Sequence, residues 1–333
     1  MGGSVFVSGA TGYIAVHTAK ELIERGYHVV GSVRTEQKGE NLKRKLGAQN
    51  FDYEIVGDIS REGSFDEALK KHPEVSVFLH IASPVTVTIE DPEKDLYVPA
   101  IDGTKNALLA AKRHGKNIKQ VVVTSSLAAM WNILEKYDSS RPLSENVWNT
   151  LTREQAARDP MLCYTVSKAL AEKAVWDFVE QEKPSFGVNT VNPSFVFGPQ
   201  AFDEDAVGDV NFSADLLASL FKLKPDDPVS GEAKPFIDVR DIAKAHIHAF
   251  EKGFNGQRLL VSEESWSPQK VLDILHENYP QAQGKLARGD PGKYETEDNV
   301  ENSKTKSLLG FKFIDLKTSV VDSYNQYLKM NPQ

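Results

Sequence analysis

The sequence predicts an α/β fold, a doubly wound parallel sheet of the Rossmann type with a smaller, interwoven C-terminal lobe. Short apolar runs alternate with helical patterns through the first half of the chain, as they do in repeated β-α-β units. The chain also opens on an apolar run, a glycine-containing turn and a helical pattern, in that order. The predicted strands are 3–8, 27–33, 51–56, 75–81, 118–124 and 186–191, and the predicted helices are 13–25, 37–46, 64–71, 92–114 and 161–182.

After residue 193 the pattern loosens, and this part of the chain is expected to cover the carboxyl edge of the sheet. The elements predicted there are a strand leading into a helix over about 236–252, a strand over 258–262, and helices near 267–278 and 315–329. We therefore expect a nucleotide-binding domain made of residues 1–192 and about 233–262. A substrate-binding lobe is expected over about 193–232 and 263–333.

Composition narrows the class of protein. The chain has 333 residues, enough for one large domain or two modest ones with a buried core. Its 39 lysines and arginines against 47 aspartates and glutamates give a net charge of −8, which argues against nucleic acid or a membrane surface as a partner. No apolar run approaches the length of a membrane-spanning helix, and the first strand begins too close to Met1 for a signal peptide.

Cysteine and histidine usage gives two further expectations. The single cysteine, Cys163, excludes an internal disulfide and suits the reducing cytoplasm, where we expect the protein to lie. We interpret it as a small packing residue. The eight histidines and one cysteine have no zinc-binding spacing, so no metal is expected.

The glycine turn after the first strand indicates a dinucleotide site. Gly9 and Gly12 allow a tight turn and a close approach of the backbone to a pyrophosphate, and Ala15 stands where a third glycine often lies. The helix that follows would direct its free N–H groups and its positive dipole end at the phosphates.

The end of the second strand favours NADP over NAD. Arg34 follows this strand, and no aspartate or glutamate ends it. An acid there would bind the ribose hydroxyl of NAD and repel the 2′-phosphate of NADP, whereas a guanidinium suits a phosphate. Lys38, one helical turn on, would add a second positive charge.

Tyr164 and Lys168 are the candidate catalytic pair. Residues four apart lie on one face of a helix, so the ammonium is expected beside the phenol. A cation there favours the phenolate, and a phenol so tuned exchanges a proton with an alcohol oxygen near neutral pH. Ser126, just after the fifth strand, is the candidate hydroxyl that would donate to a carbonyl oxygen, while Ser125 or Thr124 is expected to supply an ordinary cap there.

Taken together, these motifs resemble an extended short-chain dehydrogenase/reductase, of the branch that holds dihydroflavonol reductase and cinnamoyl-CoA reductase. The resemblance is greatest to the fungal NADPH-dependent methylglyoxal/isovaleraldehyde reductases. It runs essentially from end to end. The stretches that carry it are residues 4–15, Ser126, the Tyr164-x-x-x-Lys168 motif, and residues 192–200, 236–241, 271–275 and 308–313.

The resemblance implies a role for individual residues. The pyrophosphate of NADPH would lie against Gly9, Ala10, Thr11, Gly12, Tyr13 and Ile14, and its 2′-phosphate against Arg34 and Lys38. Its adenine would contact Asp58 and Ile59, and its riboses would contact Ala82, Tyr164 and Lys168. Its carboxamide would contact Val196, and Pro193 and Ser213 would also lie at the cofactor. The substrate pocket would be lined by Val85, Leu127, Trp131 and Phe195. The fungal pattern has aromatic residues in place of Val85 and Leu127 and a tyrosine in place of Phe195, so the pocket is expected to be wider, with one hydroxyl fewer.

The implied activity is the reduction of a small aldehyde or ketone by NADPH, with Tyr164 as the proton donor, in a monomer or a homodimer. Because no arginine or lysine stands among the four pocket residues, neutral carbonyls are expected to be better substrates than free keto acids. Two alternatives stay open. A nucleotide-sugar epimerase or dehydratase would hold NAD and prefer an acid after the second strand, and a non-catalytic NADPH-binding protein would not need Ser126, Tyr164 and Lys168 together.

Overall fold

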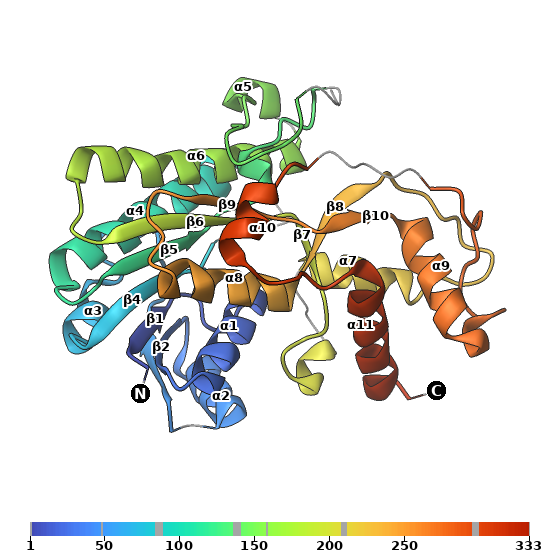
Figure 1. The fold of residues 1–333 in the computed structure, drawn as a ribbon, viewed down its shortest axis with the longest axis horizontal. Helices are drawn as coiled ribbons and strands as arrows, with labels where there is room; N and C mark the ends of the chain where they lie inside the picture. The colour runs from blue at the N-terminus through green and yellow to red at the C-terminus, as the bar shows by residue number, and fades with distance from the viewer. Residues whose placement is uncertain are drawn as a thin grey trace.

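The computed structural model describes residues 2–47, 49–83, 89–135, 141–157, 159–207, 212–294 and 300–332. These residues form a large α/β part and a smaller lobe that packs at one end of it (Figure 1).

A parallel sheet of seven strands forms the larger part, and its order is β3-β2-β1-β4-β5-β6-β9. The strands are β1 (Ser4–Val7), β2 (His28–Val33), β3 (Phe51–Ile55), β4 (Val75–His80), β5 (Gln120–Thr124), β6 (Gly187–Pro193) and β9 (Arg258–Val261). The strand order reverses between β1 and β4, and ligands in such sheets bind beyond the carboxyl ends of the strands at that point. The predicted doubly wound fold is therefore confirmed.

Helices cover both faces of the sheet (Figure 1). On one face lie α1 (Tyr13–Glu24), α2 (Glu36–Leu46) and α8 (Val239–Glu251), and on the other lie α3 (Asp66–Lys71), α4 (Val98–His114) and α6 (Pro160–Glu182). A π-helical turn at Glu93–Tyr97 leads directly into α4. The central strands are buried on both faces, which explains why they are continuous apolar runs in the sequence rather than alternating ones.

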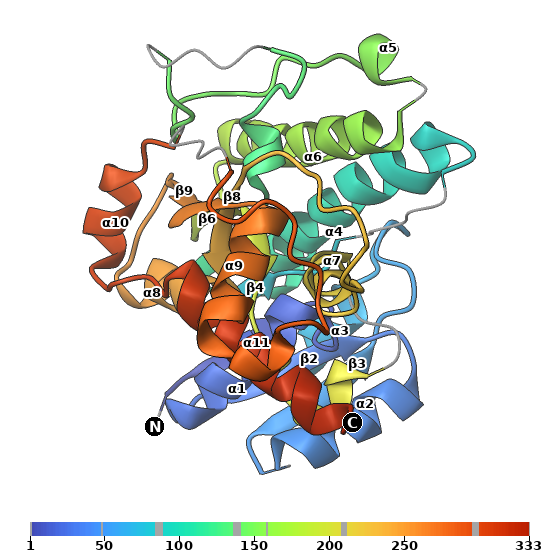
Figure 2. The same ribbon diagram turned by 90° about the vertical axis from the view of Figure 1, so that its right-hand side faces the viewer.

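The smaller lobe is built around a second sheet, in which β8 (Lys234–Asp238) pairs in parallel with β7 (Phe195–Phe197) and antiparallel with β10 (Glu264–Trp266). Its helices α7 (Phe212–Leu220), α9 (Pro268–Asn278) and α11 (Leu316–Met330) pack around an apolar cluster that includes Phe197, Phe236 and Trp266. Figure 2 looks onto this lobe, with α9 and α11 in front of the seven-stranded sheet. The helix α10 (Ser303–Leu309) lies instead against β9 and α8.

Four elements of this region were not predicted from the sequence: β7, β10, α7 and α10. The two strands have only three residues each, and the two helices have nine and seven, so their apolar periodicity is too short to stand out. The strand β8, which our boundaries assign to the nucleotide-binding domain, pairs with strands of the lobe. The domain boundaries themselves stay a prediction.

The lobe is joined to the larger part by polar contacts around α1 and α8. Tyr13 Oη donates to Gly198 O at 2.6 Å, next to the end of β7. Asp238 caps α8 by accepting from Arg240 N, and the Arg240 guanidinium bridges Asp238 to Asp322 on α11 with bonds of 2.7–2.8 Å. This bridge is the structural counterpart of the 236–241 motif.

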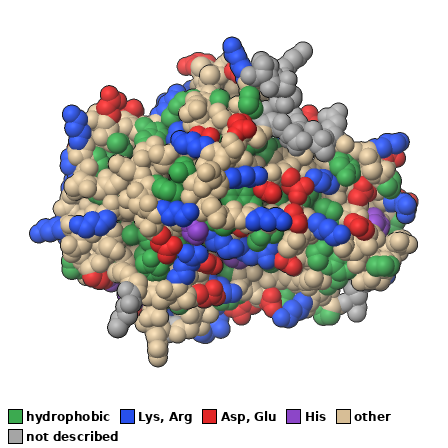
Figure 3. Space-filling view, in the orientation of Figure 1, with side chains coloured by type: hydrophobic (Ala, Val, Ile, Leu, Met, Phe, Trp, Pro, Cys, Tyr) green, Lys and Arg blue, Asp and Glu red, His purple; other side chains and the backbone are tan. Residues whose placement is uncertain are grey.

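The visible surface in Figure 3 carries lysines and arginines interspersed with aspartates and glutamates, without a continuous field of one sign. Among the described residues, no helix combines the length and the apolar character needed to cross a membrane.

Candidate active site

The glycine loop between β1 and α1 lies against the loop that follows β4. Gly9 has a φ of +63°, and a Cβ at this position would lie 3.0 Å from the Cβ of Ala82. Gly12 is the N-cap residue of α1, and no side chain caps this helix. The first N–H groups of α1 are therefore open to an external acceptor, as a pyrophosphate site requires.

Ser8 fixes the position of Ala82. Its Oγ accepts hydrogen bonds from the backbone N–H groups of Ile81 and Ala82, both at 2.9 Å. Its own hydroxyl hydrogen is left to donate to His80 Nδ1 at 3.0 Å. Burial lowers the pKa of His80 to about 3, so this imidazole is neutral and can accept that bond.

Two cations stand at the end of β2. The side chains of Arg34 and Lys38 are exposed, and within the described part of the chain neither forms a salt bridge. Thr35 accepts from Lys38 N and so begins α2 between them. Asp58 lies three residues after β3, and the hydrogen bonds that it accepts from Ser60 are the main cause of its lowered pKa, to which the charge of nearby Arg34 also contributes. This arrangement fits a phosphate on an adenosine ribose.

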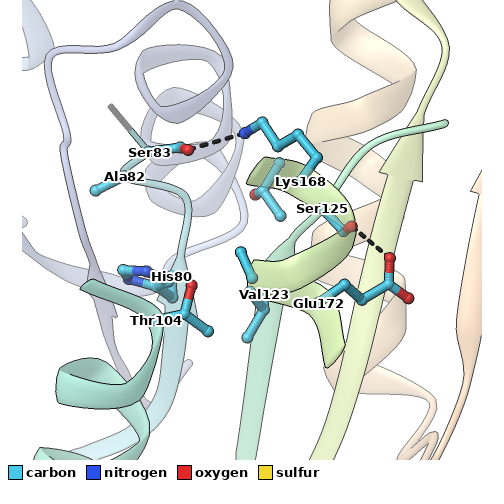
Figure 4. Close-up of a pocket in the computed structure, with 10 residues that line it drawn as sticks. His80, Ala82, Ser83, Thr104, Val123, Ser125, Lys168 and Glu172 are labelled. Atoms are coloured by element: carbon cyan, nitrogen blue, oxygen red, sulfur yellow. Dashed lines mark hydrogen bonds between the residues drawn. The ribbon is translucent and has the colours of Figure 1, made fainter. Parts of the chain in front are cut away.

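Tyr164 and Lys168 lie on one face of α6, with Lys168 Nζ 5.5 Å from the centroid of the Tyr164 ring. Lys168 is only 7% exposed, and Nζ donates to Ser83 Oγ at 2.8 Å. Figure 4 shows the lysine reaching from α6 toward the loop after β4, where Ser83 lies. Tyr164 itself is half-buried. The predicted pairing of these two residues on one helix face is therefore present.

Ser126 precedes a short 3-10 helix at Leu127–Ala129, and its Oγ accepts from Ala128 N at 3.1 Å. We expected Ser125 or Thr124 to supply a cap here, and this expectation was wrong, because Ser126 supplies it. Thr124 instead bonds to His246 Nε2, and Ser125 donates to Glu172. The reason lies in α6 and α8, whose polar side chains reach the end of β5 from outside the local sequence. Ser126 Oγ still has its own hydrogen to donate.

A small cavity of about 10 Å³, room for roughly one water molecule, lies beside Lys168 (Figure 4). Glu172, Ser125, Ser83 and His80 line it together with Lys168. None of these four residues was predicted to contribute to the site. Glu172 could most easily have been predicted from the sequence, because it follows Lys168 by four residues and so lies on the same face of α6.

Four other predicted cofactor residues lie on different elements of the fold. Ile59 follows β3, and its carbonyl accepts from Asn106 on α4 at 2.9 Å. Pro193 ends β6 and Val196 lies in β7, both buried. Ser213 is the second residue of α7 and is half-buried. Their roles as cofactor contacts stay predictions.

The predicted substrate residues are only partly brought together. Val85 lies outside the described residues. Leu127 is 4% exposed and packs with Met130, Leu143 and Leu260, whereas Trp131 is half-buried against the same cluster. Phe195 is half-buried and packs against Trp266, with the ring centroids 5.9 Å apart.

A cation that the sequence argument did not place lies beside Trp131. Lys234 Nζ, at the start of β8, is 5.3 Å from the centroid of the Trp131 ring. It also donates to Glu232 Oε2 at 2.8 Å. A positive charge therefore lies next to the four predicted pocket residues, although none of them is an arginine or a lysine. Two residues 103 positions apart in sequence meet here through the fold.

The lobe also carries a wider hollow, of about 640 Å³. It lies between the segment 225–233 and the segment 289–294, and its lining includes Asp226, Asp227, Glu232 and Asp290. None of the predicted catalytic or cofactor residues lines it. Among the described residues, no group of histidine, cysteine, aspartate and glutamate side chains is arranged to hold a metal ion.

The parallel sheet, the uncapped glycine turn at its switch point and the Tyr164–Lys168 pair define a dinucleotide-binding protein of the Rossmann type. The sequence pattern of the NAD dependent epimerase/dehydratase family matches residues 5–261, and the chain belongs to this family. The resemblance inferred from the motifs is thereby confirmed.

Several relatives match almost the whole chain. The putative NADPH-dependent methylglyoxal reductase GRP2 of Candida albicans is 50% identical, over 98% of this chain and 98% of its own length. The NADPH-dependent methylglyoxal reductase GRE2 of Saccharomyces cerevisiae is 42% identical, with the same coverage of both chains.

Solved structures agree with these relatives. The crystal structure of the yeast methylglyoxal/isovaleraldehyde reductase Gre2 complexed with NADPH has a TM-score of 0.93 and 41% identity, over 98% of this chain and 99% of that one. A UDP-glucose 4-epimerase from Stenotrophomonas maltophila with bound NAD has a TM-score of 0.73 at 17% identity, over 99% of both chains, and shares the fold alone.

Proposed function

We propose that this protein is an NADPH-dependent carbonyl reductase that converts small aldehydes and ketones to alcohols. The observation that carries the proposal is the position of Lys168, which lies on the same helix face as Tyr164 and donates from Nζ to Ser83 Oγ at 2.8 Å. A phenol with an ammonium beside it is suited to giving a proton to a forming alkoxide. The full-length similarity to fungal methylglyoxal reductases supports the same reaction.

The cofactor of this proposal is NADPH. The uncapped N-terminus of α1 fits its pyrophosphate, and the exposed Arg34 and Lys38 fit its 2′-phosphate. Two relatives of known structure were solved as NADPH complexes, one from yeast and one from Candida albicans, which supports this choice.

The bound dinucleotide supplies the hydride for the carbonyl carbon. The protein's own groups handle the carbonyl oxygen: Ser126 donates a hydrogen bond to it, and Tyr164 gives it a proton as it becomes an alcohol. Lys168 places its Nζ beside the phenol and is oriented by Ser83. Donors aimed at a developing oxyanion are commonly worth about 3 kcal/mol each, and a positioned acid contributes roughly 10²–10⁴-fold.

An epimerase or dehydratase that retains NAD is the second candidate, because the family includes such enzymes. The end of β2 argues against it, since Arg34 stands where NAD-binding proteins use an acid. A binding protein without catalysis is disfavoured by the presence of Ser126, Tyr164 and Lys168 together.

The direct test is an assay of NADPH oxidation with a panel of aldehydes and ketones, repeated with NADH. We expect turnover of neutral carbonyls with NADPH and much weaker turnover with NADH. Epimerisation of a nucleotide sugar without net oxidation of cofactor would favour the second candidate, and binding of NADPH without turnover of any carbonyl would favour the third. We further propose a cytoplasmic location, which the free thiol of buried Cys163 suits.

A further inference from the structure

Glu172 is a buried carboxylate at the centre of a polar network behind the candidate active site. It lies on α6 one turn after Lys168 and two turns after Tyr164, and it is 1% exposed. An uncompensated carboxylate in such a position is very costly, so its partners decide what it does. They come from β6, from β9, from Ser125 just after β5 and from α6 itself.

The two oxygens of Glu172 face different parts of the fold. Oε1 accepts from Arg258 Nε on β9 at 2.5 Å and from Trp176 Nε1 at 3.3 Å. Oε2 accepts from Ser125 Oγ at 2.5 Å and from Asn192 Nδ2 at 2.6 Å. Figure 4 shows Ser125 and Glu172 facing each other beside Lys168.

Arg258 balances the charge and is itself held in place. Its guanidinium carbon lies 3.7 Å from the centroid of the Trp148 ring. Its Nη1 donates to the carbonyl oxygens of Glu145 at 2.9 Å and Val147 at 2.7 Å. The Oε1 side of Glu172 is therefore anchored to the strand β9 and to the segment around Trp148.

The Oε2 side leads to Ser126 by two routes. Ser125 is its neighbour in the chain, and Asn192 Nδ2 also donates to the backbone oxygen of Ser126 at 3.2 Å. The orientation of the Asn192 amide is set, because its Oδ1 accepts from Thr190 Oγ1 at 2.8 Å. One carboxylate thus connects the helix that carries Tyr164 and Lys168 to both sides of Ser126.

We propose that Glu172 is a positioning residue, which sets the Ser126 hydroxyl relative to Tyr164 through Ser125 and Asn192. The proposal rests on the proposed catalytic role of Ser126. Its physical basis is that a donor for a developing oxyanion works only when it is held in place beforehand, and that a displacement of about 1 Å can cost 10²-fold in rate. Hydrogen bonds between fixed partners define a position more narrowly than apolar contacts do.

The amide variant Glu172→Gln shows how the network transmits a change. A glutamine that keeps its oxygen toward Arg258 turns its NH₂ group toward Ser125 and Asn192. Asn192 then has to present its oxygen, which turns its Nδ2 away from the Ser126 carbonyl. One bond that holds the Ser126 backbone is lost, although the side-chain volume is unchanged.

The test is a double-mutant cycle on kcat with NADPH and a neutral aldehyde. Ser125→Ala removes one hydroxyl from the Oε2 side, and we expect kcat to fall roughly tenfold, with the Kd of NADPH unchanged within about twofold. Glu172→Gln is expected to lower kcat at least as much. In a Ser126→Ala background, neither substitution should lower kcat further, because the group they position is already gone.

A matched control is Trp176→Phe, which removes a donor from the Oε1 side and leaves the route to Ser126 intact. We expect it to change the melting temperature but not kcat. Equal falls in kcat with and without Ser126→Ala, or no fall for Ser125→Ala, would overturn the proposal and leave Glu172 with a purely structural role. If Glu172→Gln does not fold, Ser125→Ala still decides the question. Failure of the underlying function has a different signature, namely that Ser126→Ala alone leaves kcat unchanged.

Discussion

Lys168 Nζ donates a hydrogen bond of 2.8 Å to Ser83 Oγ, which ties the helix of the candidate acid to the loop at the end of β4. Ser83 follows Ala82, whose backbone N–H is held by Ser8 at the end of β1. The ammonium therefore has a fixed place relative to the switch point of the sheet, beside the glycine turn.

The first prediction concerns the proton donor. Tyr164→Phe keeps the ring and deletes the hydroxyl, so carbonyl reduction should fall by at least about 10²-fold. NADPH binding, followed by fluorescence, should change little. A variant that turns over near the wild-type rate would show that Tyr164 is not the acid.

The second prediction concerns cofactor choice. Arg34→Asp removes a guanidinium that can pair with the 2′-phosphate and adds repulsion, so kcat/KM for NADPH should fall by about 10- to 100-fold. The value for NADH should change only a few-fold. Arg113→Asp, on an exposed position near the end of α4, makes the same change of charge away from the site and should leave both values unaltered. Equal losses for the two cofactors in Arg34→Asp would contradict the assignment.

The third prediction concerns the charge of the substrate. Lys234 lies beside Trp131, but its ion pair with Glu232 neutralises it, so a keto ester should be reduced more efficiently than the free keto acid at one pH. Glu232→Gln frees the ammonium and should raise kcat/KM for the acid a few-fold without raising that for the ester. Lys234→Met should remove this gain in the double variant. If the acid matches the ester in the wild type, another cation contacts the substrate.

The fourth prediction concerns stability in acid. Burial lowers the pKa of His80 to about 3 and that of His246 to about 4, both below the ordinary value of 6.5. The unfolded chain therefore binds more protons than the folded one below about pH 6.5, and stability falls as the pH falls from there toward 4. The slope is at most about 1.4 kcal/mol per pH unit for each histidine.

Thermal or urea unfolding between pH 7 and 4.5 measures this slope. Burial lowers the pKa of His17 to about 4 as well. His246→Gln removes one of these groups, so its stability should depend less steeply on pH, whatever its stability at pH 7. An unchanged slope in that variant would mean that other groups govern the acid transition. In the neutral form, His246 donates from Nδ1 to Ile242 O and accepts from Thr124 Oγ1 at Nε2, so both ring nitrogens are engaged without a charge.

The sequence by itself determined the parallel sheet and the residues of the candidate site that lie close together in the chain. The strands of a buried parallel sheet are continuous apolar runs, and Gly9 with Gly12 and Tyr164 with Lys168 are local spacings, so each could be read without long-range information. The residue that follows β2 could likewise be identified from the local sequence, which showed an arginine there and no acid. The predicted ranges of the long helices α1 and α6 lie within one residue of those in the structure at each end.

Only the tertiary structure decided which distant side chains meet. Ser83 accepts from Lys168, 85 positions further along the chain. Lys234, the first residue of β8, lies beside Trp131. Glu172 is paired with Arg258 on the edge strand β9. The short elements β7, β10, α7 and α10 were equally hidden. The physical reason is long-range packing: a buried polar group takes whichever partner the packed chain brings within hydrogen-bonding distance, and a short strand or helix forms because a neighbouring element pairs with it or packs against it. Neither fact leaves a periodic signal in the sequence.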